Sequence, residues 1–271
     1  MRYRYYYCSR YNKELEEYLQ NTQIKYKISA STSFIIFNIW SSDKDYQQKM
    51  LALKKWHRLG PSFTELEPSA SDLEEAKYLT IRPKKQSITV INADSSFTYL
   101  CQYGPVRRHE KQIGEIYICK EPNTDGNTAF WCEDTGFSDI FVSRKVRDLV
   151  EENELSGVSF LNVRLKKNQY CENLFQMTSS NVLKHDQLVF GYREKELICS
   201  KCGKVEYDIG SDFQLHVDFS KVLEQSDLYI TEDVFGGAPQ YIISQRFFRA
   251  IKKAKLDKNV CFLPVVDHSH L

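Results

Sequence analysis

The residues of this chain with the clearest potential for chemistry are two cysteines, Cys199 and Cys202, separated by two residues and followed by Gly203. Two thiolates at this spacing supply half of a tetrahedral zinc site, or a redox pair when the motif begins a helix. The surrounding sequence, "ELICSKCGKVEY", is typical of a strand, a tight turn and a second strand. It therefore favours a zinc knuckle or a plain hairpin turn over a thioredoxin-like redox motif.

A complete zinc site needs four ligands, so further donors must come from elsewhere in the chain. Cys101 is the third candidate, because its sequence context parallels that of Cys199. His109 and His185 are candidates for the fourth ligand. Cys199, Cys202 and Cys101 are therefore the candidate ligands of a structural zinc site, and the favoured interpretation is a hairpin turn that only retains two thiols.

No catalytic motif accompanies these cysteines. The sequence contains no HExxH, GxSxG, phosphate-binding P-loop or GxGxxG. Two acidic pairs, Glu133–Asp134 and Glu232–Asp233, recur at parallel places, but the sequence offers them no converging partner and they are interpreted as loop charges. The histidine-containing end, "DHSH", is interpreted as a tail. We expect a protein that is not an enzyme.

The composition is that of an ordinary globular protein. The 271 residues include 37 Lys and Arg against 36 Asp and Glu, so the net charge of +1 argues against nucleic acid and anionic membranes as partners. The strongest apolar run, "FIIFNIW", is too short to span a bilayer, and the start of the chain lacks the apolar core of a signal peptide. We expect a cytoplasmic protein of bacterial type with reduced cysteines.

The elements that would position these residues divide the chain into three parts. Residues 1–76 predict an N-terminal α+β domain, since strand and helix patterns alternate as βαββα before a polar, acidic connector from about residue 61. Residues 77–167 and 168–271 predict two repeat units with many short strands. The predicted fold is therefore α+β: a βαββα-type sandwich followed by a duplicated mixed β-sheet unit, each copy ending strand–helix–strand.

The duplication rests on the segments 141–163 and 242–265. Matched helix positions lie 101 residues apart, and matched positions in the following strand lie 102 apart. We expect Ser143 and Ser244 to cap the two helices, and Gly157 and Asn259 to provide the turns after them. The matched pairs are Ser143 and Ser244, Val146 and Phe247, Leu149 and Ala250, Val150 and Ile251, Leu155 and Leu256, Val158 and Val260, Phe160 and Phe262, Leu161 and Leu263, and Val163 and Val265.

The repeat extends upstream of both helices. "FWCED" from Phe130 parallels "YITED" from Tyr229, 99 residues later, and "YLCQYGPV" parallels "LICSKCGKV". Cys101 takes the place of Cys199, whereas the counterpart of Cys202 is missing. The first copy is interpreted as a CxxCG that has decayed to "CQYG".

Duplicated halves with these endings, each preceded by a CxxCG or its remnant, resemble the double-CxxCG motif family and related bacterial immunity proteins. The resemblance covers residues 78–266, and the complete CxxCG carries over only at Cys199, Cys202 and Gly203. It implies a non-catalytic protein that binds one cognate toxin of a polymorphic toxin system and neutralises it in the cytoplasm. The departure at "CQYG" puts a symmetric pair of metal sites in doubt.

Two function classes follow from these patterns. The first is the toxin-binding immunity protein, for which "VFGGAPQY" (residues 234–241) and the connector from Thr64 to Glu75 are candidate contact segments because interfaces favour aromatic residues. The alternative is a zinc-knuckle nucleic-acid-binding or regulatory protein that uses the CxxC and local basic stretches. Binding that weakens steeply with salt would distinguish the alternative.

Overall fold

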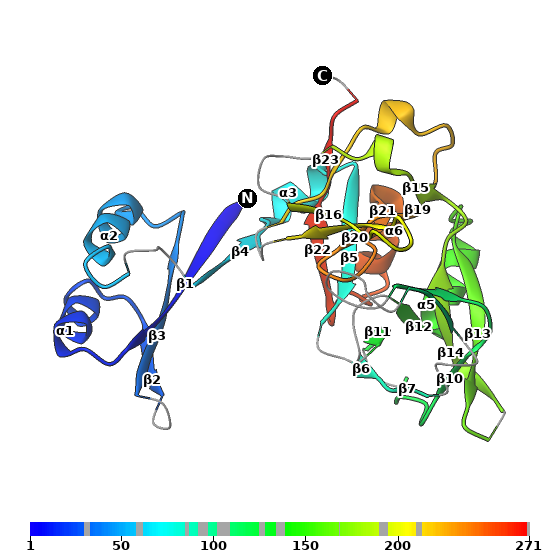
Figure 1. The fold of residues 1–271 in the computed structure, drawn as a ribbon, viewed down its shortest axis with the longest axis horizontal. Coiled ribbons are helices and arrows are strands. Elements are labelled where there is room, and N and C mark those ends of the chain that lie inside the picture. The colour runs from blue at the N-terminus through cyan, green and yellow to red at the C-terminus, as the bar shows by residue number, and fades with distance from the viewer. Residues whose placement is uncertain are drawn as a thin grey trace. The chain divides into compact units, whose positions relative to one another are not determined.

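The chain forms an α+β protein in a computed structural model, drawn as a ribbon in Figure 1. The structure describes residues 1–29, 33–57, 62–84, 87–91, 97–101, 109–124, 128–133, 139–167, 169–189, 195–209 and 213–269. It divides into an N-terminal unit, Met1–Asp72 with Gly210–Gln214, and a C-terminal unit, Leu73–Ile209 with Leu215–Leu271. Among the described residues, no helix is both long enough and apolar enough to cross a membrane.

The N-terminal unit is a four-stranded antiparallel sheet in the order β2-β3-β1-β4, with two helices on one of its faces (Figure 1). Asn12 caps the first helix by accepting a hydrogen bond from the Leu15 backbone N–H, and Leu15 and Leu19 face the sheet. The elements are β1 (Arg2–Arg10), α1 (Lys13–Asn21), β2 (Tyr26–Ser29), β3 (Phe34–Trp40), α2 (Tyr46–Leu53) and β4 (Phe63–Glu67).

The strand β4 corrects the expected βαββα order, because it lies where the sequence predicts a connector. Its stretch offers one inward apolar side chain, Leu66, between Glu65 and Glu67, so it carries no strong strand pattern. Both glutamates instead pair with arginines of β1 at the edge of the sheet. The unit is therefore βαββαβ, and the helix α3 (Ala70–Glu75) follows near the end of the predicted connector.

The C-terminal unit contains two large mixed sheets and three small ones. The first large sheet has the order β6-β11-β12-β14-β13-β10-β7, and the second has the order β15-β19-β21-β5-β22. The strands of the first are β6 (Ser87–Ile88), β7 (Val90–Ile91), β10 (Ile116–Ile118), β11 (Phe130–Glu133), β12 (Ile140–Ser143), β13 (Ser159–Leu165) and β14 (Tyr170–Thr178). The strands of the second are β5 (Tyr78–Pro83), β15 (Val182–Leu183), β19 (Leu228–Thr231), β21 (Tyr241–Ser244) and β22 (Val260–Pro264).

The remaining elements of the C-terminal unit are small sheets, helices and 3₁₀ turns. The small sheets pair β8 (Phe97–Cys101) with β9 (His109–Gln112), β16 (Lys195–Ile198) and β20 (Val234–Phe235) with β17 (Val205–Asp208), and β18 (His216–Val217) with β23 (Val266–Asp267). The helices are α5 (Arg144–Glu152), α6 (Gln245–Lys253), and the 3₁₀ turns η1 (His185–Gln187) and η2 (Phe219–Lys221).

The two strand–helix–strand endings predicted from the repeat are present as β12-α5-β13 and β21-α6-β22. Ser244 caps α6 by accepting a hydrogen bond from the Phe247 N–H at 3.1 Å. Ser143 occupies the same position before α5, but its hydroxyl makes no capping hydrogen bond. The prediction of two serine caps is therefore confirmed for α6 and wrong for α5.

The turns that end the two helices differ from the predicted ones. The left-handed residue two positions after each helix is Glu154 or Lys255, at φ 48° and 59°. In each copy the next residue, Leu155 or Leu256, returns a backbone hydrogen bond to the last helical turn, which is the Schellman arrangement. The sequence did not predict these turns, because left-handed positions are usually occupied by glycine and both of these positions carry a long charged side chain. Gly157 does have a φ of +72°, but it lies three residues further on.

The first strand of each repeat has changed places with its counterpart. β14 belongs in sequence to the second copy, yet it lies between β12 and β13 of the first sheet, and β5 lies between β21 and β22 of the second. The registers agree: Met177 faces Ile140 and Phe160, while Ile81 faces the equivalent Tyr241 and Phe262. Each sheet therefore depends on a strand from the other copy.

The pairing also corrects the upstream alignment of the repeats. Phe130 faces Val142, and Leu228 faces the equivalent Ile243, so the strands β11 and β19 match at a spacing of 98 residues and not 99. A slip by one residue would reverse which side chains face the core. Phe130 and Leu228 are both buried in the same core. The shared letters "ED" favoured the wrong register because Glu133 is the last residue of β11, whereas Glu232 follows the end of β19.

One hydrophobic core joins the two copies. It contains apolar residues of α5 and α6 together with residues from both large sheets, including the exchanged Ile81 and Met177. A separate core around Trp131 lies on the other face of the first sheet, and the N-terminal unit has its own core around Tyr7 and Phe37. The two copies therefore form one packed body although their sequences are arranged in tandem.

Candidate functional site

The CxxC motif lies at the turn of the β16–β17 hairpin, which confirms the predicted strand–turn–strand arrangement. The Cys199 carbonyl accepts a hydrogen bond from the Gly203 N–H at 2.8 Å, and the Cys199 N–H donates to the Lys204 carbonyl at 3.0 Å. Gly203 has a φ of +72°, a left-handed conformation that suits glycine. These contacts hold both cysteines on one tight turn.

The two thiols of this turn are reduced and differ in exposure. Cys199 is buried, Cys202 is half-buried, and neither forms a disulfide. The turn joins two strands, so neither thiol lies at a helix N-terminus, which is one arrangement that activates CxxC cysteines. The geometry supports a structural use of these cysteines.

The zinc hypothesis needs donors beyond the two cysteines of this turn. Cys199 and Cys202 present two soft ligands from one turn, as a zinc knuckle requires. The backbone of Cys101 ends β8 and that of His109 begins β9, but their side chains lie outside the part of the chain that the structure describes. Among the described residues, no group of three or more His, Cys, Asp and Glu could hold a metal. The three-cysteine site stays a prediction.

The strand β20 completes the small sheet beside the hairpin by pairing with β17 in parallel. The glycines after it, Gly236 and Gly237, form a turn with φ values of 58° and 89°, and the Phe235 N–H donates to the Ala238 carbonyl. The apolar residues of this segment, Val234, Phe235, Ala238 and Tyr241, are all buried. The aromatic side chains that suggested a contact segment in "VFGGAPQY" therefore belong to the core.

A histidine–carboxylate pair lies on the same small sheet, and the sequence did not reveal it. His185 Nδ1, from η1, is 2.8 Å from Asp233 Oδ2, which precedes β20. Asp233 is buried whereas the His185 side chain is about half exposed. Since a carboxylate only accepts hydrogen bonds, the proton between the two groups is assigned to Nδ1. The pair fixes the orientation of the imidazole ring.

Tyr207 of β17 extends this cluster. Its hydroxyl is 3.4 Å from His185 Nδ1, and its ring stacks on Phe235 at a centroid distance of 5.1 Å. A ring held in this way by a buried carboxylate is suited to proton transfer or to metal ligation. The signal that could have found it was Asp233 within the repeated "ED", but its partner lies 48 residues away in the chain.

The other acidic candidates do not join this cluster. Glu232 pairs with Lys184 at 3.2 Å on the exposed surface, which agrees with its interpretation as loop charge. Of the first pair, the side chain of Glu133 and all of Asp134 lie outside the described residues. In the terminal "DHSH", His268 Nε2 is 2.8 Å from His216 Nδ1, so this part of the expected tail is held against β18.

Asp227 is a second buried carboxylate, and it connects the two copies. It accepts hydrogen bonds from the Ser156 N–H of the first copy at 2.8 Å and from the Ser244 hydroxyl of the second at 2.5 Å. Arg246 Nη2 donates to the oxygen that also accepts from Ser156, Oδ2, at 2.6 Å. Burial opposes ionisation of Asp227, but hydrogen bonds from Arg246 and Ser244 outweigh it and hold its pKa below the usual value. The first copy has Ala129 at the equivalent place.

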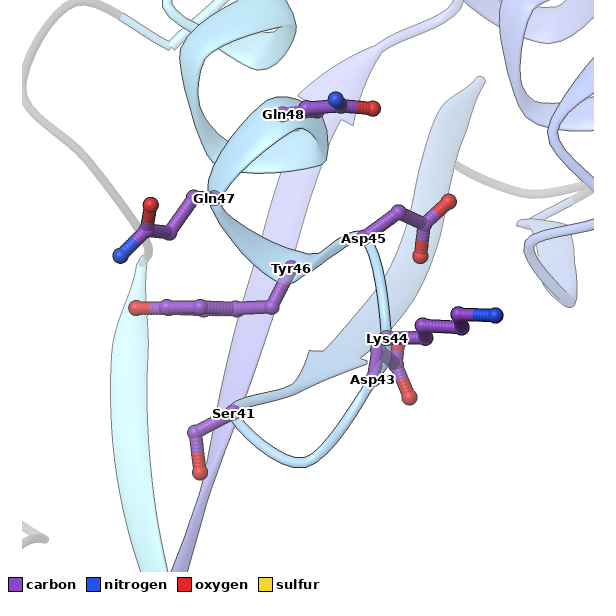
Figure 2. A pocket seen from close by; sticks show the side chains of 7 residues that line it. All are labelled: Ser41, Asp43, Lys44, Asp45, Tyr46, Gln47 and Gln48. Carbon is purple, nitrogen blue, oxygen red and sulfur yellow. The ribbon is translucent and has the colours of Figure 1, made fainter.

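Surface depressions lined by described residues lie in both units. One of about 400 Å³ lies beside Asp227, and one of about 590 Å³ lies between α5 and α6, with charged Lys145, Asp148 and Lys253 around Leu149. The third, of about 750 Å³, surrounds the loop before α2 in the N-terminal unit. Figure 2 shows that the side chains around this third depression point in different directions. It therefore lacks the converging polar groups of a small-molecule site.

Comparison with known proteins assigns neither a family nor a function to this chain. No protein-family model matches the sequence, and no curated protein matches it. The resemblance to double-CxxCG and immunity proteins therefore depends on the residues and repeat described above.

Proposed function

We propose that this protein is a non-catalytic immunity protein that binds one cognate bacterial toxin in the cytoplasm and neutralises it. The observation that carries the proposal is the duplicated scaffold, in which two copies share strand order, register and a β-hairpin, and the second hairpin retains CxxCG. This is the arrangement that the resemblance to double-motif immunity proteins implies. The two copies pack around one shared hydrophobic core, so their surfaces belong to a single folded body.

The proposal is tested with the product of the adjacent open reading frame. Co-expression of both proteins should restore growth of cells that the neighbour alone kills, and the two purified proteins should elute together in size-exclusion chromatography. A neighbour that is not toxic, or a toxic neighbour that forms no complex, contradicts the proposal.

Stoichiometry separates neutralisation by binding from neutralisation by catalysis. If the protein acts by occupying the toxin, protection of the toxin's target in vitro should be complete only near one equivalent of this chain. Full protection at about a hundredth of an equivalent would instead indicate an enzyme, since a catalyst turns over.

The variant His185→Gln sharpens this test, because His185 and Asp233 form the candidate acid–base pair described above. The glutamine amide is polar, but unlike an imidazole it cannot take up and release a proton near neutral pH. We expect this variant to bind and protect as the parent does. A variant that still forms the complex and no longer protects would favour a catalytic function.

The CxxCG turn favours one alternative, a zinc-knuckle nucleic-acid-binding or regulatory protein. Two thiols on a tight hairpin turn are the donor half that such a knuckle uses. Elemental analysis of protein purified without chelator tests the metal directly. Less than about a tenth of an equivalent of zinc would remove this alternative.

A further inference from the structure

The N-terminal sheet has one face that neither α1 nor α2 covers (Figure 1). Alternation along the strands directs Tyr7, Ile35, Phe37 and Ile39 toward the helices. The opposite side chains are the even-numbered residues of β1 and β3, with Lys27 of β2 and with Glu65 and Glu67 of β4. We call this side the open face. It extends over all four strands, and most of its side chains come from the central strands β1 and β3.

One end of the open face is a stack of planar groups. The Arg4 guanidinium carbon lies 3.9 Å from the centroid of the Trp40 ring, and the Arg2 carbon lies 4.3 Å from it. Glu67 pairs with Arg2 at 2.9 Å, and the Tyr6 hydroxyl donates to Glu65 at 2.7 Å. These contacts fix rings and guanidinium planes before any ligand arrives, which lowers the entropic cost of binding.

The other end of the open face carries two exposed cations, Arg10 and Lys27. Neither forms an ion pair among the described residues. Arg10 faces the half-buried Phe34 across the strands, and Lys27 faces Ile36, which is 42% exposed. Positive charge therefore lies directly beside exposed apolar and aromatic surface.

The charge of this face differs from that of the chain. Its described side chains include four cations, Arg2, Arg4, Arg10 and Lys27, against two carboxylates, Glu65 and Glu67. The whole chain has a net charge of +1 only because acidic residues elsewhere offset such local excess. Net charge alone is therefore a weak argument against an anionic ligand at this place.

We propose that the open face binds single-stranded nucleic acid. Arginine planes and aromatic rings stack on bases of any sequence, and unpaired cations beside them attract phosphates. From Arg4 to Arg10 the strand β1 spans about 20 Å, and a widespread RNA-binding module stacks two or three bases on a four-stranded sheet in this way. The inference goes beyond the proposed function and concerns the N-terminal unit, not the CxxC turn.

The direct test is fluorescence anisotropy with the full chain and labelled oligo(U) and oligo(dT) probes of about twelve nucleotides. Binding should weaken about sevenfold between about 50 and 200 mM salt if Arg10 and Lys27 each neutralise one phosphate. Equal affinity for both probes assigns binding to bases and phosphates, and a preference for oligo(U) over oligo(dU), which lacks only the 2′-hydroxyl, adds a contact with that group. Absence of binding to either probe, or equal binding of a duplex, overturns the proposal.

Variants then place the ligand on this face. Ile36→Glu introduces a negative charge at an exposed position and should reduce affinity at least tenfold, while Arg10→Ala with Lys27→Ala should remove most of the salt dependence. The control is Lys13→Ala with Lys54→Ala, which removes the same charge from α1 and from the end of α2. Equal loss in the control, or no loss with Ile36→Glu, overturns the assignment.

A protein ligand is the remaining outcome that the variants distinguish. If no oligonucleotide binds and Ile36→Glu abolishes the complex with the toxin, the open face is a protein-docking surface and the present inference is wrong. If the parent chain forms no toxin complex but binds oligonucleotides, the proposed function fails and this inference stands. Thermal unfolding of each variant verifies that the N-terminal unit remains folded.

Discussion

Asp227 in the second repeat accepts a hydrogen bond of 2.8 Å from the backbone N–H of Ser156 in the first. The same carboxylate also accepts from Ser244 and Arg246 at the start of α6. It therefore joins the turn after one helix to the beginning of the equivalent helix in the other copy. Ala129 occupies its place in the first copy, so this connection exists once in the duplicated scaffold.

Replacing Asp227 by alanine should destabilise the C-terminal unit by about 2 kcal/mol. The change leaves the Ser156 N–H without its acceptor and removes the partner of Arg246. We expect a moderate loss because the Arg246 side chain is 57% exposed and water screens the ion pair. Urea unfolding measures the difference. Asp257→Ala, which breaks an exposed pair with Lys252, is the control and should cost less than about 0.5 kcal/mol. Equal costs would contradict the role of Asp227.

The same carboxylate should make stability depend on acid. The pKa of Asp227 in the folded protein lies below its unfolded value of 3.8, so the ionised form is bound more tightly in the folded state. Its contribution is complete above the unfolded pKa and is lost as the pH falls through the folded pKa. Urea unfolding between about pH 2 and pH 6 should therefore show a smaller loss of stability at low pH for Asp227→Asn than for the parent. Parallel curves would contradict the assignment.

Gly203 and Gly157 offer a matched test of backbone strain and packing, because both have a φ of +72°. An added Cβ at Gly203 meets nothing within 4 Å, whereas at Gly157 it would overlap Ser226 Oγ and Asn181 Nδ2. Gly203→Ala should cost about 1 kcal/mol, which is the penalty of the left-handed conformation. Gly157→Ala should cost clearly more, since neighbouring atoms must also move. Urea unfolding compares them, and a larger cost at Gly203 would show that the CxxC turn has a tighter environment.

Thiol labelling should follow burial in the native protein. Cys8 and Cys119 are exposed, whereas Cys171 is buried and burial raises its pKa to about 12. Because the thiolate is the reactive form, a disulfide reagent at pH 8 should modify Cys8 and Cys119 within minutes and leave Cys171 unmodified until the protein unfolds. Mass spectrometry of peptides identifies the modified sites. Early modification of Cys171 would show that the first sheet opens in solution.

The sequence predicted the local parts of this fold better than the long-range ones. Both repeat helices follow from apolar residues at helical spacing, and the CxxC hairpin follows from strand residues around a glycine turn. The strand β4 was missed because Leu66 is its only inward apolar residue between two charges. The pair of His185 and Asp233 depends on tertiary packing between segments 48 residues apart, which no local pattern encodes.

The exchange of the first strands could not be predicted from the sequence either. β5 and β14 have the same pattern of buried side chains, but they have no sequence motif in common. Leu79 and Ile81 of β5 correspond to Phe175 and Met177 of β14, and all four are buried in the common core. Any strand with apolar residues at alternate positions satisfies that requirement. Short local patterns therefore could not decide which copy each strand would join.

This exchange predicts that the second repeat cannot fold alone as a monomer. A fragment of residues 168–271 lacks β5, so the gap between β21 and β22 would expose backbone groups and the core side of Ile243 and Phe262. Its own β14 has the pattern to fill that gap in a second fragment. We therefore expect the fragment to form a strand-exchanged dimer, as identical elements pass between protomers in domain swapping.

Light scattering after size exclusion measures the mass of this fragment. Adding residues 73–84 as a synthetic peptide should compete for the gap and convert the dimer to a monomer, and a stable monomer without the peptide would contradict the exchange.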